Sequence, residues 1–130
     1  MNLSKPALIG VIHLRPLPGS PRWGGSMQAV MASAAADARE FVEGGADAVV
    51  IENFGDVPFT SRRVPAETVA AMSAVGTHLR ESTGIELPFG YNVLRNDPLS
   101  ALGLAAATGG SFVRVNVHAG AMVTDQGVIE

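Results

Sequence analysis

The sequence predicts an α/β fold built on a parallel sheet, and three observations support this. Short apolar runs alternate with longer segments of helical periodicity along the chain. A capping residue or a proline stands at the start of each helical segment, and glycine pairs follow two of them. With 130 residues, of which 47% are hydrophobic and 16% charged, the chain can bury one core.

The first half of the chain contains two predicted strands and one helix. Residues 7–13 form an apolar run that predicts a buried strand, and a Pro/Gly-rich loop over 15–21 follows it. Ser26 can cap a helix with apolar residues at helical spacing. The glycines at 44–45 end that helix, because glycine adopts the left-handed closing conformation without a Cβ clash. Residues 46–51 then predict the second strand.

The second half repeats this order. Pro65 suits the first turn of a helix, and residues 88–93 predict the third strand. Asp97, followed by proline, has the cap-then-proline order of a helix start. That Ala-rich helix ends at the glycine pair 109–110, and residues 111–117 predict the fourth strand. The tail after it contains no predicted helix.

The alternation βαβαβαβ favours a parallel sheet with right-handed crossovers. Residues 44–50 and 109–115 resemble one another, which fits a barrel of repeated units better than a doubly wound sheet. The first strand also lacks the G-x-G-x-x-G turn of a dinucleotide site. A (β/α)8 barrel of the TIM type takes about 250 residues. We therefore expect residues 1–130 to form one half of a single barrel domain, with its first four strands and three helices.

The composition of the chain limits the kinds of partner that we expect it to bind. The formal charge is −3 and there is no basic run, so we expect no nucleic-acid partner. No apolar stretch is long enough to cross a bilayer, and residues 1–6 lack the layout of a secretory signal, so we expect a cytoplasmic protein. The absence of cysteine excludes thiolate metal sites. The sequence identifies no cofactor. A half-barrel leaves strand edges unpaired, which predicts a homo-oligomer or a requirement for a C-terminal half.

Polar side chains gather where the predicted strands end, and sites of parallel α/β folds lie at that rim. From these we predict substrate-binding residues at Asn53, Asp56, Asn92, Arg95, Asn96, Arg114 and Asn116. Three further residues are candidates for acid–base catalysis: Glu52, His13 and His118. A hydrogen-bonded structural role remains the alternative for each histidine. We name no metal ligands, since His13, Glu52, Asp56 and His118 show no recognisable ligand spacing.

The fourth strand is the most informative. Its side-chain period of two places three valines on one face and Arg114 and Asn116 on the other. If the valines pack against helices, Arg114 points into the barrel and needs carboxylate or carbonyl oxygens as partners, and Glu52 is the nearest candidate if it also faces inward. The pair then either holds the barrel in register or presents an arginine that grips a carboxylate or phosphate. Which of Glu52 and Asn53 points to the inner face stays open, because the residues on both faces of that strand are apolar. For Asp97 we prefer the helix cap to catalysis.

Several blocks together resemble the BtpA/SgcQ family, in the family's order and across nearly the whole chain. They are residues 9–14 with 16–19, then 51–59, 92–97, 112–118 and 124–127. The resemblance implies a TIM-like barrel of the ribulose-phosphate-binding type, about twice this length, of which this chain is the N-terminal half. It also adds Asp125, in the last block, to the expected substrate-binding residues.

The resemblance leaves three functions open. The first is an enzyme or degenerate enzyme that binds a small polar or anionic metabolite, such as a sugar phosphate. The name-giving cyanobacterial member is associated with photosystem I biogenesis, which implies instead a non-catalytic factor peripheral to the thylakoid membrane. SgcQ-like members occur in non-photosynthetic organisms. The third possibility is a fragment with no function of its own.

Overall fold

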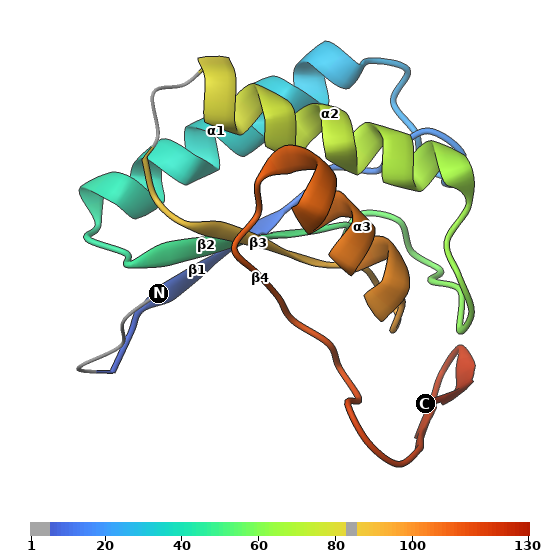
Figure 1. The fold of residues 1–130 in the computed structure, drawn as a ribbon. Coiled ribbons are helices and arrows are strands. Elements are labelled where there is room, and N and C mark those ends of the chain that lie inside the picture. Colours follow the sequence, from blue (N-terminus) through green and yellow to red (C-terminus); the bar gives the residue numbers. More distant parts are fainter. Residues whose placement is uncertain (1–5, 83–85) are drawn as a thin grey trace.

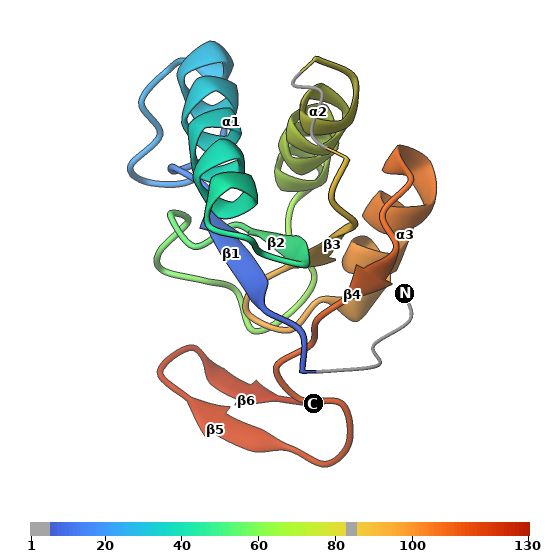
Figure 2. The same cartoon turned by 90° about the vertical axis from the view of Figure 1, so that its left-hand side faces the viewer.

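A parallel sheet with strand order β1-β2-β3-β4 forms the main part of the molecule, in a computed structural model that describes residues 6–82 and 86–130. Its strands are β1 (Ile9–His13), β2 (Ala48–Glu52), β3 (Phe89–Asn92) and β4 (Phe112–Val113). The connecting helices are α1 (Met27–Glu43), α2 (Ala66–Ser82) and α3 (Pro98–Thr108), and all three cover the same face of the sheet (Figures 1 and 2). The predicted α/β class is confirmed, and the arrangement is compatible with part of a (β/α)8 barrel. The prediction that the N-terminus lacks a secretory signal rests on residues 1–6, and residues 1–5 lie outside the described residues.

Side chains alternate between the two faces of the sheet. The register aligns Ile12 with Ile51 and Ile51 with Tyr91, and all three side chains are fully buried against the helices. The next residue of each strand points to the opposite face, because the side-chain period of a strand is two. On that face His13 stands beside Glu52. The row at the strand ends is therefore directed away from the helices.

Tyr91 connects the sheet to two helices. Its hydroxyl lies 2.7 Å from the Thr108 hydroxyl, which in turn donates to the carbonyl oxygen of Leu104 at 2.7 Å. Burial raises the pKa of Tyr91, an effect that the contact with Thr108 and the charge of Arg80 partly oppose. On the α2 side, Gly76 leaves room for this hydroxyl because it has no side chain. The tyrosine thus fixes the packing of α2 and α3.

The predicted helix starts are confirmed. The Ser26 hydroxyl accepts a hydrogen bond from the Ala29 N–H at 3.2 Å, as a cap of α1 should. At the other end, Gly44 donates to the Glu40 carbonyl and Gly45 takes a φ of 78°. The left-handed closing residue of α1 is thus the second glycine of the pair.

Asp97 caps α3, as predicted, and also fixes a second segment. Its carboxylate accepts hydrogen bonds from the Ser100 N–H at 3.0 Å, the Ser100 hydroxyl at 2.6 Å and the Val64 N–H at 3.0 Å. Burial by itself would raise the pKa of Asp97. The hydrogen bonds from Ser100 and Val64, with the positive charge of Arg63, outweigh it and lower the pKa below its usual value.

Replacing Asp97 with alanine is expected to lower the free energy of unfolding by about 1–2 kcal/mol at neutral pH, because α3 loses its cap. A lowered pKa stabilises the fold above the unfolded value of about 3.9, and this stabilisation is lost as the pH falls through the folded value. Urea unfolding at pH 7 and pH 3 measures both effects. Asp97→Asn should keep much of the cap and lose this pH dependence, and equal stability of Asp97→Ala and wild type at pH 7 would contradict the prediction.

The fourth strand is shorter than predicted. Regular pairing ends at Val113, although the Arg114 N–H still donates to the Tyr91 carbonyl at 2.9 Å. Beyond it, the N–H groups of Asn116 and Val117 donate to the Asn96 side-chain oxygen, both at 3.0 Å. A side chain replaces the neighbouring strand as acceptor, so the chain leaves the sheet at this point.

An antiparallel hairpin that the sequence analysis missed follows this segment. It consists of β5 (Met122–Thr124) and β6 (Gly127–Ile129), with Gly127 at a φ of 111°. The hairpin lies on the side of the sheet away from the helices (Figures 1 and 2). Two β-branched runs around Asp125-Gln126-Gly127 are the signal that could have predicted it.

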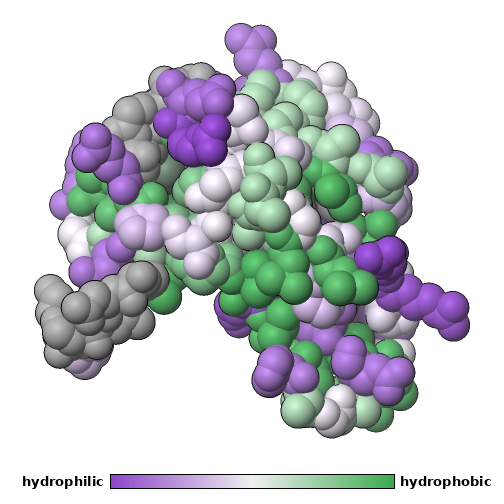
Figure 3. Space-filling view, in the orientation of Figure 1, coloured by the Kyte–Doolittle hydropathy of each residue, from purple (hydrophilic) through white to green (hydrophobic). Residues whose placement is uncertain are grey.

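The face of the sheet opposite the helices borders a hollow with apolar surface near the hairpin (Figure 3). Ile9 is 39% exposed, and Val123 in the hairpin is 82% exposed. Within residues 6–82 and 86–130, every helix is too short or too polar to cross a membrane.

Candidate functional site

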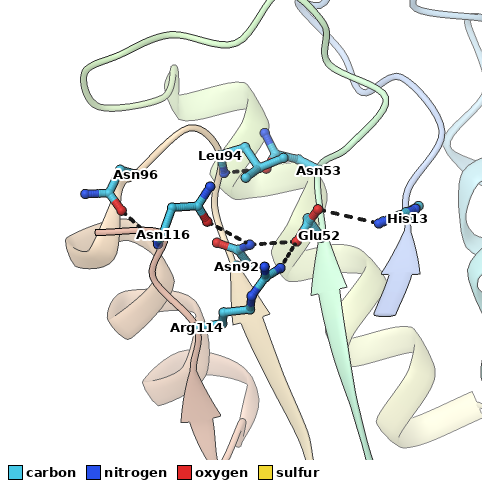
Figure 4. Close-up of polar contacts among 8 residues, drawn as sticks. All are labelled: His13, Glu52, Asn53, Asn92, Leu94, Asn96, Arg114 and Asn116. Atoms are coloured by element: carbon cyan, nitrogen blue, oxygen red, sulfur yellow. Dashed lines mark hydrogen bonds and ion pairs between the residues drawn. The ribbon is translucent and has the colours of Figure 1, made fainter. Parts of the chain in front are cut away.

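Five polar side chains meet at the carboxyl ends of the four parallel strands. His13, Glu52 and Asn92 are the last residues of β1, β2 and β3, and the register places them in one row. Arg114 and Asn116 come from the segment that follows β4 (Figure 4). We call these five residues the Glu52 group. The predicted convergence of polar side chains from four strands is thus present at this rim.

Glu52 is the centre of the group. Its Oε2 accepts hydrogen bonds from Asn92 Nδ2 at 2.6 Å and from Arg114 Nη1 at 2.9 Å, and its Oε1 lies 3.5 Å from His13 Nε2. Asn92 Nδ2 also donates to Asn116 Oδ1 at 3.3 Å. Glu52 therefore lies on the same face of the sheet as Arg114. The structure thus decides between Glu52 and Asn53, which the sequence could not, and confirms Glu52 as the arginine's partner.

The exposure of these side chains differs sharply. The Glu52 side chain is 5% exposed, whereas those of His13 and Arg114 are 52% and 55% exposed. Burying a carboxylate costs several kcal/mol unless charged or polar donors replace its water. Arg114 and Asn92 supply these donors. The buried carboxylate thus holds an arginine and a histidine that both still reach solvent.

His13 is positioned by an aromatic side chain as well as by Glu52. Its ring stacks on Phe54, with centroids 4.2 Å apart and planes 17° from parallel. Phe54 is 48% exposed and contacts Phe59 at a centroid distance of 6.2 Å. A histidine oriented by a carboxylate, with its other ring nitrogen free of any such contact within the described part of the chain, is suited to accept or donate a proton. Sequence reasoning gave Phe54 no role, although it lies two residues after Glu52.

Asn53 and Asp56 form a separate network that joins three loops. Asn53 Oδ1 accepts from the Leu94 N–H at 2.7 Å, and Asn53 Nδ2 donates to Asp56 Oδ2 at 3.3 Å. Asp56 Oδ1 accepts from the Leu17 N–H at 2.7 Å. Burial raises the pKa of Asp56, while the hydrogen bonds from Leu17 and Asn53 oppose this effect. Both side chains hold the loops that surround the rim, and their substrate-binding role stays a prediction.

Asn96 holds the segment after β4. Besides accepting from the two N–H groups described above, its Nδ2 donates to the carbonyl oxygens of Val117 at 3.1 Å and Glu130 at 3.2 Å. Arg95 lies nearby, with its guanidinium carbon 5.9 Å from the Phe59 ring centroid. Both residues border the rim without contacting Glu52.

The two remaining predicted residues, His118 and Asp125, are exposed. Among the described residues, no hydrogen bond, ion pair or ring contact joins either of them to the Glu52 group. The same part of the chain contains no set of three or more His, Asp or Glu side chains arranged to hold a metal ion. The catalytic role of His118 and the binding role of Asp125 stay predictions.

Sequence comparison identifies the relatives of this chain. A sequence model of the BtpA family matches residues 4–130. The chain belongs to the BtpA family. An uncharacterized protein of Pyrococcus furiosus is 48% identical over 130 residues, which are 100% of this chain and 48% of the relative. No solved structure matches the chain.

Two further BtpA-family relatives carry descriptive names. Photosystem I biogenesis protein BtpA of Synechocystis sp. is 47% identical over 123 residues, 95% of this chain and 42% of the relative. Putative sgc region protein SgcQ of Escherichia coli is 39% identical over 124 residues, 94% of this chain and 44% of the relative. The chain thus spans about half the length of the curated relatives it matches.

Proposed function

We propose that residues 1–130 form the N-terminal half of one (β/α)8 barrel of the ribulose-phosphate-binding type. Four parallel strands in sequential order, with all three helices on one face, support this architecture. Relatives about twice as long leave room for four more strand–helix units. In this proposal the free edges of β1 and β4 pair with a C-terminal half or with a second copy.

The proposed activity is binding of, or chemistry on, a small polar or phosphorylated metabolite at the rim that carries the Glu52 group. Arg114 is the anchor for a phosphate or carboxylate, since a guanidinium matches such oxygens with two parallel N–H groups. The amides of Asn92 and Asn116 orient the ligand. His13 transfers a proton, with Glu52 fixing its ring.

One observation carries this proposal: the buried carboxylate of Glu52 contacts both His13 and Arg114 on the face of the sheet away from the helices. Both side chains stand at the carboxyl ends of the strands, the rim at which barrels of this type place their sites. The arginine and histidine are therefore in a position to contact a ligand. Their placement favours the ligand-gripping interpretation of Arg114 over the purely structural one.

Replacing Arg114 with glutamine tests the proposal. We expect the affinity for a phosphorylated metabolite to fall about ten- to a hundredfold, because a charge-assisted hydrogen bond is lost. The free energy of unfolding should also fall, by about 1–3 kcal/mol, because the buried Glu52 carboxylate loses its charged donor. Calorimetric titration with a panel of sugar phosphates and the matching free sugars measures the affinity, and urea unfolding measures the stability.

Arg39→Gln is the matched control, because it removes the same charge from an exposed position on α1. It should leave binding unchanged. Unaltered affinity in Arg114→Gln would contradict the anchoring role. A large loss of stability with unaltered affinity would assign the pair to structure alone.

The name of the cyanobacterial relative supports a second candidate function, a factor in photosystem I biogenesis. In this second proposal the protein is non-catalytic and lies at the periphery of the thylakoid membrane. Co-fractionation of the protein with thylakoids of a phototrophic host, with loss of photosystem I on its deletion, would support this function. Turnover of a defined metabolite by the purified protein would instead support the first.

A further inference from the structure

A cavity of about 370 Å³ lies beside the start of α1 and shares no residue with the Glu52 group. Its wall combines the loop after β1 with the first residues of α1, and includes Arg15, Arg22 and Trp23. The volume falls within the range of small-molecule pockets, roughly 300–1,000 Å³. It is large enough for a ring-containing metabolite.

The cavity has a distinctive charge. Arg15 and Arg22 both line it, and no acidic residue does. Within residues 6–82 and 86–130, neither guanidinium forms a hydrogen bond or an ion pair with another side chain. Two arginines on one wall, with no acidic residue beside them, give this cavity a positive local charge that attracts anions.

Trp23 gives the same cavity a flat apolar surface. The side chain is half buried and packs against the hydrophobic core, and the backbone N–H of Trp23 donates to the Ser20 carbonyl at 3.1 Å, so the loop that carries it is held in place. Indole faces stack on planar rings and on cations. Gly24, which has no side chain, and Ala29, which has a small one, also line the cavity.

We propose that this cavity binds a phosphate monoester attached to a planar aromatic ring, the chemistry of a nucleoside monophosphate. The two guanidinium groups hold the phosphate oxygens, and the ring stacks on Trp23. The Ser26 hydroxyl, which accepts from the Ala29 N–H, is not used in these contacts. The site therefore depends on the arginines and the indole, not on the helix start, and it is independent of the metabolite proposed for the rim.

Trp23 is the only tryptophan of the chain, so its fluorescence reports on this cavity directly. Titration with adenosine 5′-monophosphate should give a saturable change in emission, with an affinity at least tenfold above those of adenosine and of inorganic phosphate. Arg15→Gln and Arg22→Gln should each weaken binding about tenfold or more, and Arg15→Lys should weaken it less, because it keeps the charge and loses the planar fork.

Arg39→Gln provides the control for net charge and should bind as wild type does. Melting curves by circular dichroism exclude unfolding as the cause of any loss. Three results would overturn the proposal: no saturable change at millimolar nucleotide, equal affinity for adenosine and its monophosphate, or equal weakening by Arg39→Gln and Arg15→Gln. None of these outcomes bears on metabolite binding at the rim, because the Arg114→Gln titration tests that separately.

Discussion

Replacing Gly76 with alanine is expected to lower the free energy of unfolding by about 2–3 kcal/mol. An added Cβ at this position would overlap the Tyr91 hydroxyl. That hydroxyl has no alternative position, because the Tyr91 side chain is fully buried and contacts the Thr108 hydroxyl at 2.7 Å. Helix α2 would have to move away from the sheet, and apolar contacts along its whole length would loosen. Urea unfolding followed by circular dichroism measures the change.

A second variant isolates the cause. Tyr91→Phe removes the overlapping oxygen and should cost about 1 kcal/mol by itself, through the lost hydrogen bond. The double variant Gly76→Ala/Tyr91→Phe should then be more stable than the sum of the two single changes implies. Additive losses would show that the hydroxyl is not the atom in conflict.

Gly103 in α3 provides a matched helical control, since a Cβ there meets nothing within 4 Å. Gly103→Ala should stabilise the protein by about 0.5–1 kcal/mol, because alanine favours the helix. If Gly76→Ala and Gly103→Ala had the same effect, the close packing of α2 on Tyr91 would be refuted.

Local signals predicted the elements that local interactions determine. Ser26 and Asp97 cap their helices through hydrogen bonds to residues three positions later, so the sequence contains the whole interaction. The length of β4, by contrast, is determined by a contact between residues that are distant in sequence. It depends on Asn96, whose side chain takes two N–H groups from residues about twenty positions further along the chain. No periodicity in the fourth strand contains that information.

In the candidate site, too, some features could be predicted from local sequence and others could not. The alternation around Arg114 predicted an inward arginine, and its pairing with Glu52 at 2.9 Å agrees. The sequence of β2 could not show whether Glu52 or Asn53 shares the face of Arg114, because the residues on both faces of that strand are apolar. The register with His13 decided it. Phe54 was missed because its stacking on His13 joins the loop after β2 to the end of β1, which is distant in sequence.

Replacing Glu52 with glutamine is expected to slow the turnover that we propose for a metabolite at the rim about 100- to 10,000-fold, the range that acid–base catalysis contributes. Glutamine keeps the size of the side chain but removes the charge that orients His13 from 3.5 Å. Binding should fall less than tenfold, because Arg114 keeps its charge and loses its negative partner. Nuclear magnetic resonance of the metabolite measures turnover, and calorimetry measures binding.

His13→Gln serves as the companion variant, since a carboxylate that acts through a histidine loses its effect when the histidine is absent. The two single variants and the double variant should therefore be similarly slow, and independent, multiplying losses would argue against a paired role. Wild-type turnover in Glu52→Gln would refute the acid–base assignment. A metabolite that binds the wild type and stays unchanged would leave Arg114 as an anchor without chemistry, and the name of the cyanobacterial relative would then become the better guide to function.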